Sequence, residues 1–429
     1  MGCNYLIQKF DFKILKVKLF LSKLRNHHTF KNVGYLTLAN VLSQLISLVG
    51  AFYIPKLLGP AYYGIYNSVI AYVALFGVFT FSGLTKVIIR ESAKDTSKAQ
   101  EILESTIGLR SLCSLLAATL SIVVVLFVDY ELGTKFYIAV YSFSLLIQGT
   151  QDSINTVFIS HQKMKILGAV AIAKQLLRVP MSILLLHLGY GVLSLIILHL
   201  ILEISTTIYF YRASQRIIGF KFFSKIQISK EYLYSGGRFS LLNFFNVLSG
   251  KADLVMLSFL TTPTNVGIYA LAYRLVEKGL MLRVPISLSL FPYYSAKFEN
   301  KKPHIKELLT HTALISIPLV IFLVPTIFLI EPLILSVIGQ EFIASADIFK
   351  VLVFYLVFNF SVIPWGLSLQ TTSNEKYSLI TVSVCAIANI FLNFVLFSKY
   401  GIIGIAYATL LVEIIRLSIT IFLVKIKIL

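Results

Sequence analysis

Long apolar segments, separated by short polar or basic connections, recur along all 429 residues of the chain. Each segment holds about 20 residues, the length that an α-helix needs to cross the hydrocarbon core of a bilayer. Apolar residues follow one another continuously instead of alternating with polar ones, which favours helices over the strands of a β-barrel. The pattern predicts twelve membrane-spanning helices, at residues 35–55, 66–88, 106–128, 136–158, 167–187, 190–212, 237–259, 267–293, 309–331, 344–369, 376–398 and 401–425.

One short motif occurs twice beside these segments. Residues 60–66 read Pro-Ala-Tyr-Tyr-Gly-Ile-Tyr, and residues 263–269 read Pro-Thr-Asn-Val-Gly-Ile-Tyr. Further along, Glu203 has a counterpart in Glu413. We interpret the motif as a structural device, in which the proline starts a turn, the glycine allows close packing, and the last tyrosine lies at the depth of the lipid headgroups.

The repeat predicts two related halves of six helices each. Because an even number of helices returns the chain to the same side, the halves are expected to be parallel repeats around a central cavity. The predicted fold class is therefore an all-α integral membrane protein of about twelve helices. Its expected parts are a basic amphipathic N-terminal segment at 1–34, a six-helix bundle at 35–212, a basic connector at 213–236 and a second bundle at 237–429.

Composition and charge support this class and predict an orientation. Charged residues make up 13% of the chain, about half the usual share in soluble proteins. The positive-inside rule places both termini in the cytoplasm, because seven Lys and Arg precede residue 35 whereas the connections on the other side hold only Lys56, Lys135 and Lys399. The net charge of +19 is then explained by topology and by contact with membrane lipids. We expect no nucleic acid partner.

Charged side chains deep inside the predicted spans mark the expected site. A charge near the centre of a spanning helix costs roughly 2.5–3.5 kcal/mol on insertion scales, so these residues should face a paired or watery interior. The basic residues outnumber the acidic ones by three, which predicts a cationic cavity for an anionic substrate. The thirteen residues are Lys174, Arg178, Lys251, Arg274, Lys278, Arg283, Lys350, Arg416, Asp152, Glu203, Asp253, Glu277 and Glu413.

An alternative interpretation is that these charges neutralise one another and serve only to hold the helices together. Acidic and basic residues close in sequence are suitable partners. The expected pairs are Arg274 with Glu277, Lys251 with Asp253, and Arg416 with Glu413.

Several motifs resemble a known family of transporters. The segment Leu-Leu-Gly-Pro at 57–60 and Tyr-Gly-Ile-Tyr at 63–66 is similar to the region after the first helix of polysaccharide-repeat-unit flippases, the Wzx-type transporters of O-antigen and capsule units. This family belongs to the superfamily that also contains multidrug exporters and the lipid II flippase. The resemblance continues through residues 82–84, 88–91, 253, 266–273 and 291–295. It covers essentially the whole chain and includes the number of helices.

The resemblance implies translocation of undecaprenyl-pyrophosphate-linked oligosaccharides across the bacterial cytoplasmic membrane. A pyrophosphate needs positive groups along its route, because its desolvation without counter-charge is prohibitive. On the basis of burial, we assign its binding to Arg274, Lys278, Arg283, Arg178 and Lys174. The family is thought to exchange its cargo against an ion gradient, and the acids expected to couple transport to an ion are Asp253, Glu203 and Glu413. A complex with a polysaccharide polymerase is a further expectation. We expect no enzymatic activity, cofactor or metal.

Two other functions remain open from the sequence. A multidrug exporter of the same superfamily would share the two-by-six plan, but it would carry fewer basic residues in its cavity. A membrane polysaccharide polymerase or ligase would need catalytic groups on a large outer loop, and the longest expected outer loop, 332–343, holds one acid in Glu341. The positive surplus and the short loops favour the flippase.

Overall fold

The computed structural model describes residues 28–94, 99–220, 230–298, 304–372 and 375–428. Most of the predicted N-terminal segment, at 1–27, and the centre of the connector, at 221–229, lie outside the described residues. Within the described ranges all regular structure is helical. The helices are α2 (His28–Phe76), η1 (Gly77–Thr80), α3 (Leu84–Lys94), α4 (Ala99–Leu126), α5 (Leu132–Ser160), α6 (Met164–His187), α7 (Gly191–Gln215), α8 (Lys230–Leu260), α9 (Pro263–Leu280), α10 (Arg283–Phe298), α11 (Ile305–Leu333), η3 (Ile334–Ile338), η4 (Gln340–Phe342), α12 (Ala344–Thr371), α13 (Glu375–Tyr400) and α14 (Ile402–Lys427).

These helices form twelve columns in the described part of the chain, as the hydrophobic pattern predicts. The first two columns share α2, which bends at Gly59, where φ is +71°. Glycine adopts this backbone conformation without the steric cost that a side chain brings, and Pro60 follows it directly. The second column continues through η1 and α3, and the eighth consists of α9 and α10 with a break at residues 281–282. The fold class is therefore confirmed.

The outer surface of the bundle is strongly apolar. Phe127 is 86% exposed and Phe328 is 75% exposed, and many further leucines and phenylalanines cover the outside. Among the described residues, eight helices are long and apolar enough to cross a membrane. The remaining columns, formed by α5, α8 and by α9 with α10, contain several of the charged residues singled out by the sequence. The molecule is a multi-pass membrane protein whose polar helices contribute to its interior.

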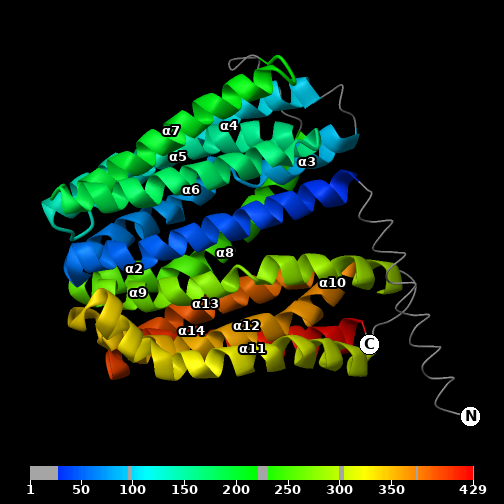
Figure 1. Cartoon of the computed structure of the whole chain (residues 1–429). Helices are drawn as coiled ribbons and strands as arrows, with labels where there is room; N and C mark the ends of the chain where they lie inside the picture. The colour runs from blue at the N-terminus through cyan, green and yellow to red at the C-terminus, as the bar shows by residue number, and fades with distance from the viewer. Residues whose placement is uncertain (1–27, 95–98, 221–229, 299–303, 373–374, 429) are drawn as a thin grey trace, which may run out of the picture.

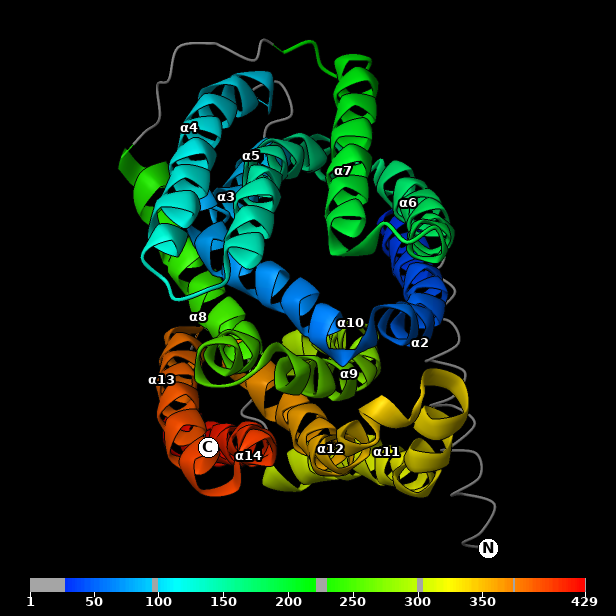
Figure 2. The ribbon, with the colours of Figure 1, turned by 90° about the vertical axis from the view of Figure 1, so that its left-hand side faces the viewer.

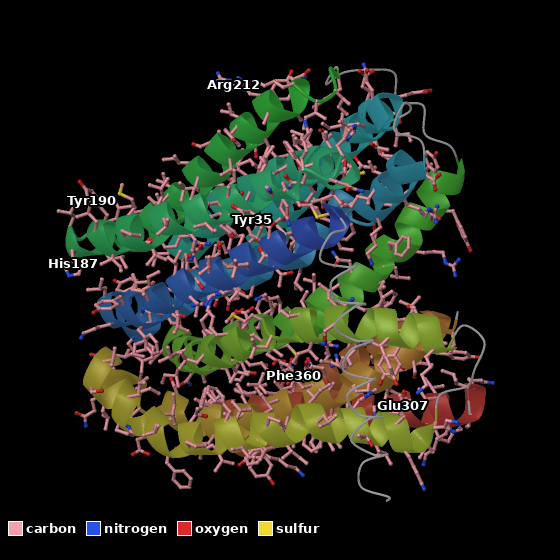
Figure 3. All side chains as sticks on the ribbon, turned by 45° about the vertical axis from the view of Figure 1, so that its right-hand side comes forward. Tyr35, His187, Tyr190, Arg212, Glu307 and Phe360 are labelled. Carbon is pink, nitrogen blue, oxygen red and sulfur yellow. The ribbon has the colours of Figure 1, made fainter. Side chains whose placement is uncertain are left out.

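The helices form two lobes on either side of a seam (Figure 1). Helices α2 to α7 form the N-lobe and α9 to α14 form the C-lobe, with α8 between them (Figure 2). The start of α2 and the end of α14 lie at one end of the bundle, which we call the terminal end. His187 and Tyr190 lie at the other end, which we call the opposite end (Figure 3). The domain boundaries within the chain stay predictions.

The two copies of the repeated motif pack directly against each other at the opposite end. A Cβ atom on Gly64 would lie 1.8 Å from the carbonyl oxygen of Pro263, and one on Gly267 would lie 1.9 Å from that of Pro60. The second column of α2 therefore crosses α9 at backbone contact distance. Beside the crossing, the rings of Tyr63 and Phe342 meet edge to face with centroids 6.1 Å apart. The interpretation of the motif glycines as close-packing positions is confirmed.

The interpretation of the motif tyrosines is wrong. Tyr66 is 4% exposed and Tyr269 is fully buried, so neither lies in an exposed belt at headgroup depth. The Tyr66 hydroxyl accepts a hydrogen bond from Arg178, and the Tyr269 hydroxyl donates one to Asp253. A tyrosine can turn its ring into a core and still bind a polar group through its hydroxyl. Each copy of the motif thus contacts one of the embedded charged residues.

Candidate functional site

A pocket of about 190 Å³ lies on the seam, which we call the seam pocket. Its N-lobe wall comes from α2 and α6, and its C-lobe wall comes from α9. The bend at Gly59 brings both columns of α2 to this place, because the first supplies Gln44 and Ser47 while the second supplies Tyr63 and Tyr66. The pocket is thus built from both halves of the molecule, at the position that rocking of the lobes would alter.

Three basic side chains line the seam pocket: Arg178 from α6, and Arg274 and Lys278 from α9. Arg178 donates to the Tyr66 hydroxyl at 3.2 Å. Lys278 donates to Gln44 Oε1 at 2.9 Å and also to Ser47 Oγ. These partners are uncharged, so they orient the cations without neutralising them.

Only one of these three cations has an acidic partner among the described residues. Arg274 Nη1 lies 3.3 Å from Glu277 Oε2, and the other oxygen of the same carboxylate lies 3.6 Å from Lys251 Nζ. Arg178 and Lys278 form no ion pair in the described part of the chain. The Glu277 carboxylate is therefore shared by Arg274 and Lys251, whereas Arg178 and Lys278 have no carboxylate partner in the described structure. An anion with several oxygens, such as a phosphate, would satisfy the excess donors.

Lys174 lies in a different cavity, which we call the N-lobe chamber. This cavity of about 370 Å³ lies within the N-lobe between α2, α5, α6 and α7. Lys174 Nζ is 3.0 Å from Glu203 Oε1, and His199 Nε2 is 3.7 Å from the same oxygen. The structure therefore pairs two of the predicted site residues, Lys174 and Glu203, and separates both from the seam pocket.

Arg110 is a buried charge that we did not single out from the sequence, since it lies near the end of a predicted span. Its side chain is fully buried, and Nη2 lies 3.4 Å from Asp152 Oδ2. Its other nitrogens donate to Thr85 Oγ1, Ser153 Oγ and the carbonyl oxygen of Thr80. An arginine whose three nitrogens are all hydrogen-bonded in this way fixes α4 to α3, α5 and η1, and it is unavailable to a substrate. Asp152 could have pointed to Arg110 in the sequence, because a carboxylate inside a membrane span requires a nearby cation.

Arg283 lies in the C-lobe and not in the seam pocket. The break at residues 281–282 starts a new helix, α10, at Arg283, so its direction does not follow from its spacing to Arg274. It lines a cavity of about 220 Å³, the C-lobe pocket, together with Tyr355, Glu413 and Arg416. Arg416 forms the expected ion pair with Glu413. The predicted pyrophosphate residues thus divide into three in the seam pocket, Lys174 in the N-lobe and Arg283 in the C-lobe.

Asp253 does not pair with Lys251, contrary to the sequence-based expectation, because Lys251 contacts Glu277 instead. The Asp253 carboxylate is 2% exposed and accepts hydrogen bonds from the Tyr269 and Thr409 hydroxyls, at 2.8 and 2.7 Å, and from Asn393 Nδ2 at 2.8 Å. All three donors are neutral. Asp253 therefore differs from Glu203 and Glu413, which both have a basic partner in the described structure.

A comparison with family models relates the chain to known proteins. Residues 29–298 match the family described as "Polysaccharide biosynthesis protein". The matched region includes both copies of the repeated motif and the residues Arg178, Arg274 and Lys278 of the seam pocket. No curated protein matches the chain significantly.

Solved transporter structures share the fold. The lipid II flippase MurJ in an inward closed conformation superposes with a TM-score of 0.78 at 19% identity, over 91% of this chain and 87% of that one. The MATE multidrug transporter DinF-BH superposes with a TM-score of 0.68 at 16% identity, over 93% of this chain and 95% of that one. A transporter of the MOP superfamily from Pyrococcus furiosus superposes with a TM-score of 0.60 at 15% identity, over 94% of this chain and 97% of that one. At these identities the similarity concerns the fold.

Proposed function

Because the chain belongs to the polysaccharide biosynthesis protein family, we propose that it flips undecaprenyl-pyrophosphate-linked oligosaccharides across the bacterial cytoplasmic membrane. The observation that carries this proposal is the group of three cations at the seam, two of which have no acidic partner in the described structure. The shared fold with MurJ, described as a lipid II flippase, agrees with cargo of this chemical class. Transport by alternating access needs a site that both lobes build, and the seam pocket is such a site.

In this proposal the cations of the seam pocket replace the water around the pyrophosphate. Arg178 on the N-lobe and Arg274 and Lys278 on the C-lobe hold the head group from two sides. The uncharged partners Tyr66, Gln44 and Ser47 keep the donors in place when the cargo leaves. The polyprenyl tail stays in lipid. The terminal end faces the cytoplasm, and the crossing at Gly64 and Gly267 closes the other side.

A multidrug exporter is the alternative, since transporters of the MATE type share the fold. Cationic drugs would need acidic groups in the central site. The described lining of the seam pocket contains three basic and no acidic side chains, which favours an anionic cargo. A polysaccharide polymerase or ligase has weaker support, because the solved structures that share this fold are described as a flippase and as transporters.

The decisive experiment asks on which leaflet the lipid-linked precursor accumulates when the gene is deleted. We expect deletion to abolish the surface polysaccharide and to leave the precursor in the cytoplasmic leaflet, where an impermeant glycan-oxidising reagent cannot reach it in intact spheroplasts. Wild-type protein should restore both. If deletion leaves the polymer and the precursor unchanged, the polysaccharide assignment is wrong, and export of cationic drugs should be measured next.

Asp253 is the acid that we propose for ion coupling, with Glu203 and Glu413 as the other candidates. A carboxylate buried among neutral donors has no resident counter-charge to compete with an incoming cation, whereas the other two acids are already paired. We expect Asp253→Asn, which preserves shape, to lower transport at least tenfold in proteoliposomes with an imposed proton or sodium gradient. Transport without a gradient should change far less. The matched control is Glu413→Gln, and an equal response of both variants to the gradient would remove the special role of Asp253.

A further inference from the structure

The N-lobe chamber is the largest of the cavities described above, yet the seam pocket accounts for the head group without it. Its volume of about 370 Å³ falls within the range of roughly 300–1,000 Å³ that is typical of small-molecule sites. The seam pocket, at about 190 Å³, is much smaller. The N-lobe thus contains space for a ligand group larger than a phosphate.

The charges in the chamber cancel. Asp152 is paired with Arg110, and Glu203 is paired with Lys174. The seam pocket instead has an excess of positive charge. A chamber whose acids are already compensated suits an uncharged group that carries many polar atoms.

Two amides in the chamber are open to such a group. Gln148 is exposed and forms no hydrogen bond in the described structure, and Gln151 uses only its Oε1 atom, which accepts from Thr207. A side-chain amide offers two donors and an acceptor, which match hydroxyl groups that both donate and accept. Across the chamber, Ile70 and Val73 provide an apolar wall. Polar groups on one side and apolar groups on the other match a sugar ring, whose hydroxyls point outward and whose C–H groups form its faces.

The chamber lies directly beside the seam pocket, because the same two helices line both cavities. On α2, Tyr66 lines the seam pocket and Ile70 lines the chamber. On α6, Gln175 lines the seam pocket and its neighbour Lys174 lines the chamber. One helical turn advances about 5.4 Å. Along α2 and α6 the two cavities are therefore separated by no more than about one helical turn.

We infer that the N-lobe chamber binds the sugar attached directly to the diphosphate, with Gln148 and Gln151 as hydrogen-bonding residues. This inference rests on the proposed function and adds that selection among cargoes occurs in the N-lobe. The Lys174–Glu203 pair contributes a donor and an acceptor to the same sugar. The seam pocket then recognises what all such lipids share, and the chamber recognises what distinguishes them.

Binding of two probes to the purified full-length protein in nanodiscs tests this inference. One probe is the lipid-linked oligosaccharide precursor extracted from the host strain, and the other is undecaprenyl diphosphate, which has no sugar. Wild type should bind the precursor at least tenfold more tightly. Gln148→Leu and Gln151→Leu should each weaken precursor binding about three- to tenfold, the loss of one or two hydrogen bonds, and leave undecaprenyl diphosphate binding unchanged. Gln370→Leu, in a pocket of the C-lobe, is the matched control and should change neither.

The two probes separate failure of the inference from failure of the proposed function. If wild type binds both probes equally, or if the chamber variants bind the precursor as wild type does, the sugar site is not in the chamber, although the flippase proposal stands. If Glu203→Gln alters transport while both glutamine variants are silent, the chamber serves ion coupling and the inference is wrong. If Arg274→Gln affects neither probe, the seam pocket is not the head-group site, and the proposed function loses its main support.

Discussion

Gly64→Ala is expected to force the two lobes apart at the opposite end and to abolish transport. The added methyl carbon would overlap the Pro263 carbonyl oxygen at 1.8 Å, and the other side of the crossing is equally tight, with 1.9 Å from Gly267 to Pro60. Both neighbours are backbone, so no side chain can move aside. Overpacking of this kind costs about 1–3 kcal/mol. We expect a melting temperature several degrees lower. A cysteine placed at Ser47 should also react faster with an impermeant thiol reagent that is added on the side of the membrane where the opposite end lies.

The control for this prediction is Gly133→Ala, because a Cβ atom at Gly133 meets nothing within 4 Å. It should leave stability, labelling and transport as in wild type. The double variant Gly64→Ala/Gly267→Ala should lose less stability than the sum of the losses in the two single variants. Both methyl groups act on the same crossing, and the effects of neighbouring changes are not additive. If the Gly64→Ala variant is labelled and transports like wild type, this crossing does not close the opposite end.

Arg274→Gln is expected to reduce binding of undecaprenyl diphosphate and flipping of the precursor by about 30- to 4,000-fold. Loss of one partner from a buried, hydrogen-bonded charge pair costs about 2–5 kcal/mol, which corresponds to this range. Arg274 belongs to the C-lobe wall and shares its carboxylate partner with Lys251, so its guanidinium is only partly neutralised. The measurement is binding of the sugar-free lipid to purified protein, followed by the leaflet assay in cells.

Arg283→Gln provides the comparison for this prediction. It removes the same charge from the same column of helices, but in the C-lobe pocket. We expect its effect on undecaprenyl diphosphate binding to be less than about threefold, an effect smaller than a single hydrogen bond normally produces. If Arg283→Gln proves as damaging as Arg274→Gln, the head group contacts the C-lobe pocket as the sequence suggested, and the division into separate pockets has no bearing on binding.

The fold could be predicted from the sequence because lipid imposes a simple rule on it. Every spanning segment must satisfy its backbone internally and must be about 20 apolar residues long. Most of the twelve columns therefore follow from hydropathy, whereas those of α5, α8 and α9 with α10 are interrupted by charged residues. The repeated motif added the two-lobe plan, because Gly64 and Gly267 occur at equivalent places in the two halves.

The site was only partly predictable, because it depends on directions that spacing does not determine. Arg274 and Lys278 are one turn apart on an unbroken helix, and the structure places them in one pocket. Arg283 follows a break at residues 281–282, and the break turns it toward the C-lobe pocket. The same reasoning explains Lys251, which is close to Asp253 in sequence but contacts Glu277 on another helix.

Tyr66 and Tyr269 show a second reason for the limits of prediction. A tyrosine near the end of an apolar segment is typical of the membrane interface, so the sequence favoured that position for both. Packing between helices decides otherwise, because both rings are buried and both hydroxyls bind charged side chains of other helices. Each copy of the tyrosine binds an embedded charged residue, Arg178 in one case and Asp253 in the other. The presence of such charges in the spans was the feature of the sequence that could have indicated a buried position.

The crossing of the repeated motifs also restricts how the two halves can diverge in evolution. After a duplication, each half is normally free to accumulate its own substitutions. Here the glycine of one copy rests on the proline carbonyl of the other copy, and the reverse contact is equally close. A larger residue in either copy cannot be rescued by a smaller one in its partner, because both are already glycine. Drift should therefore have erased most of the ancestral likeness between the halves and spared the proline and the glycine of this motif, which both copies retain.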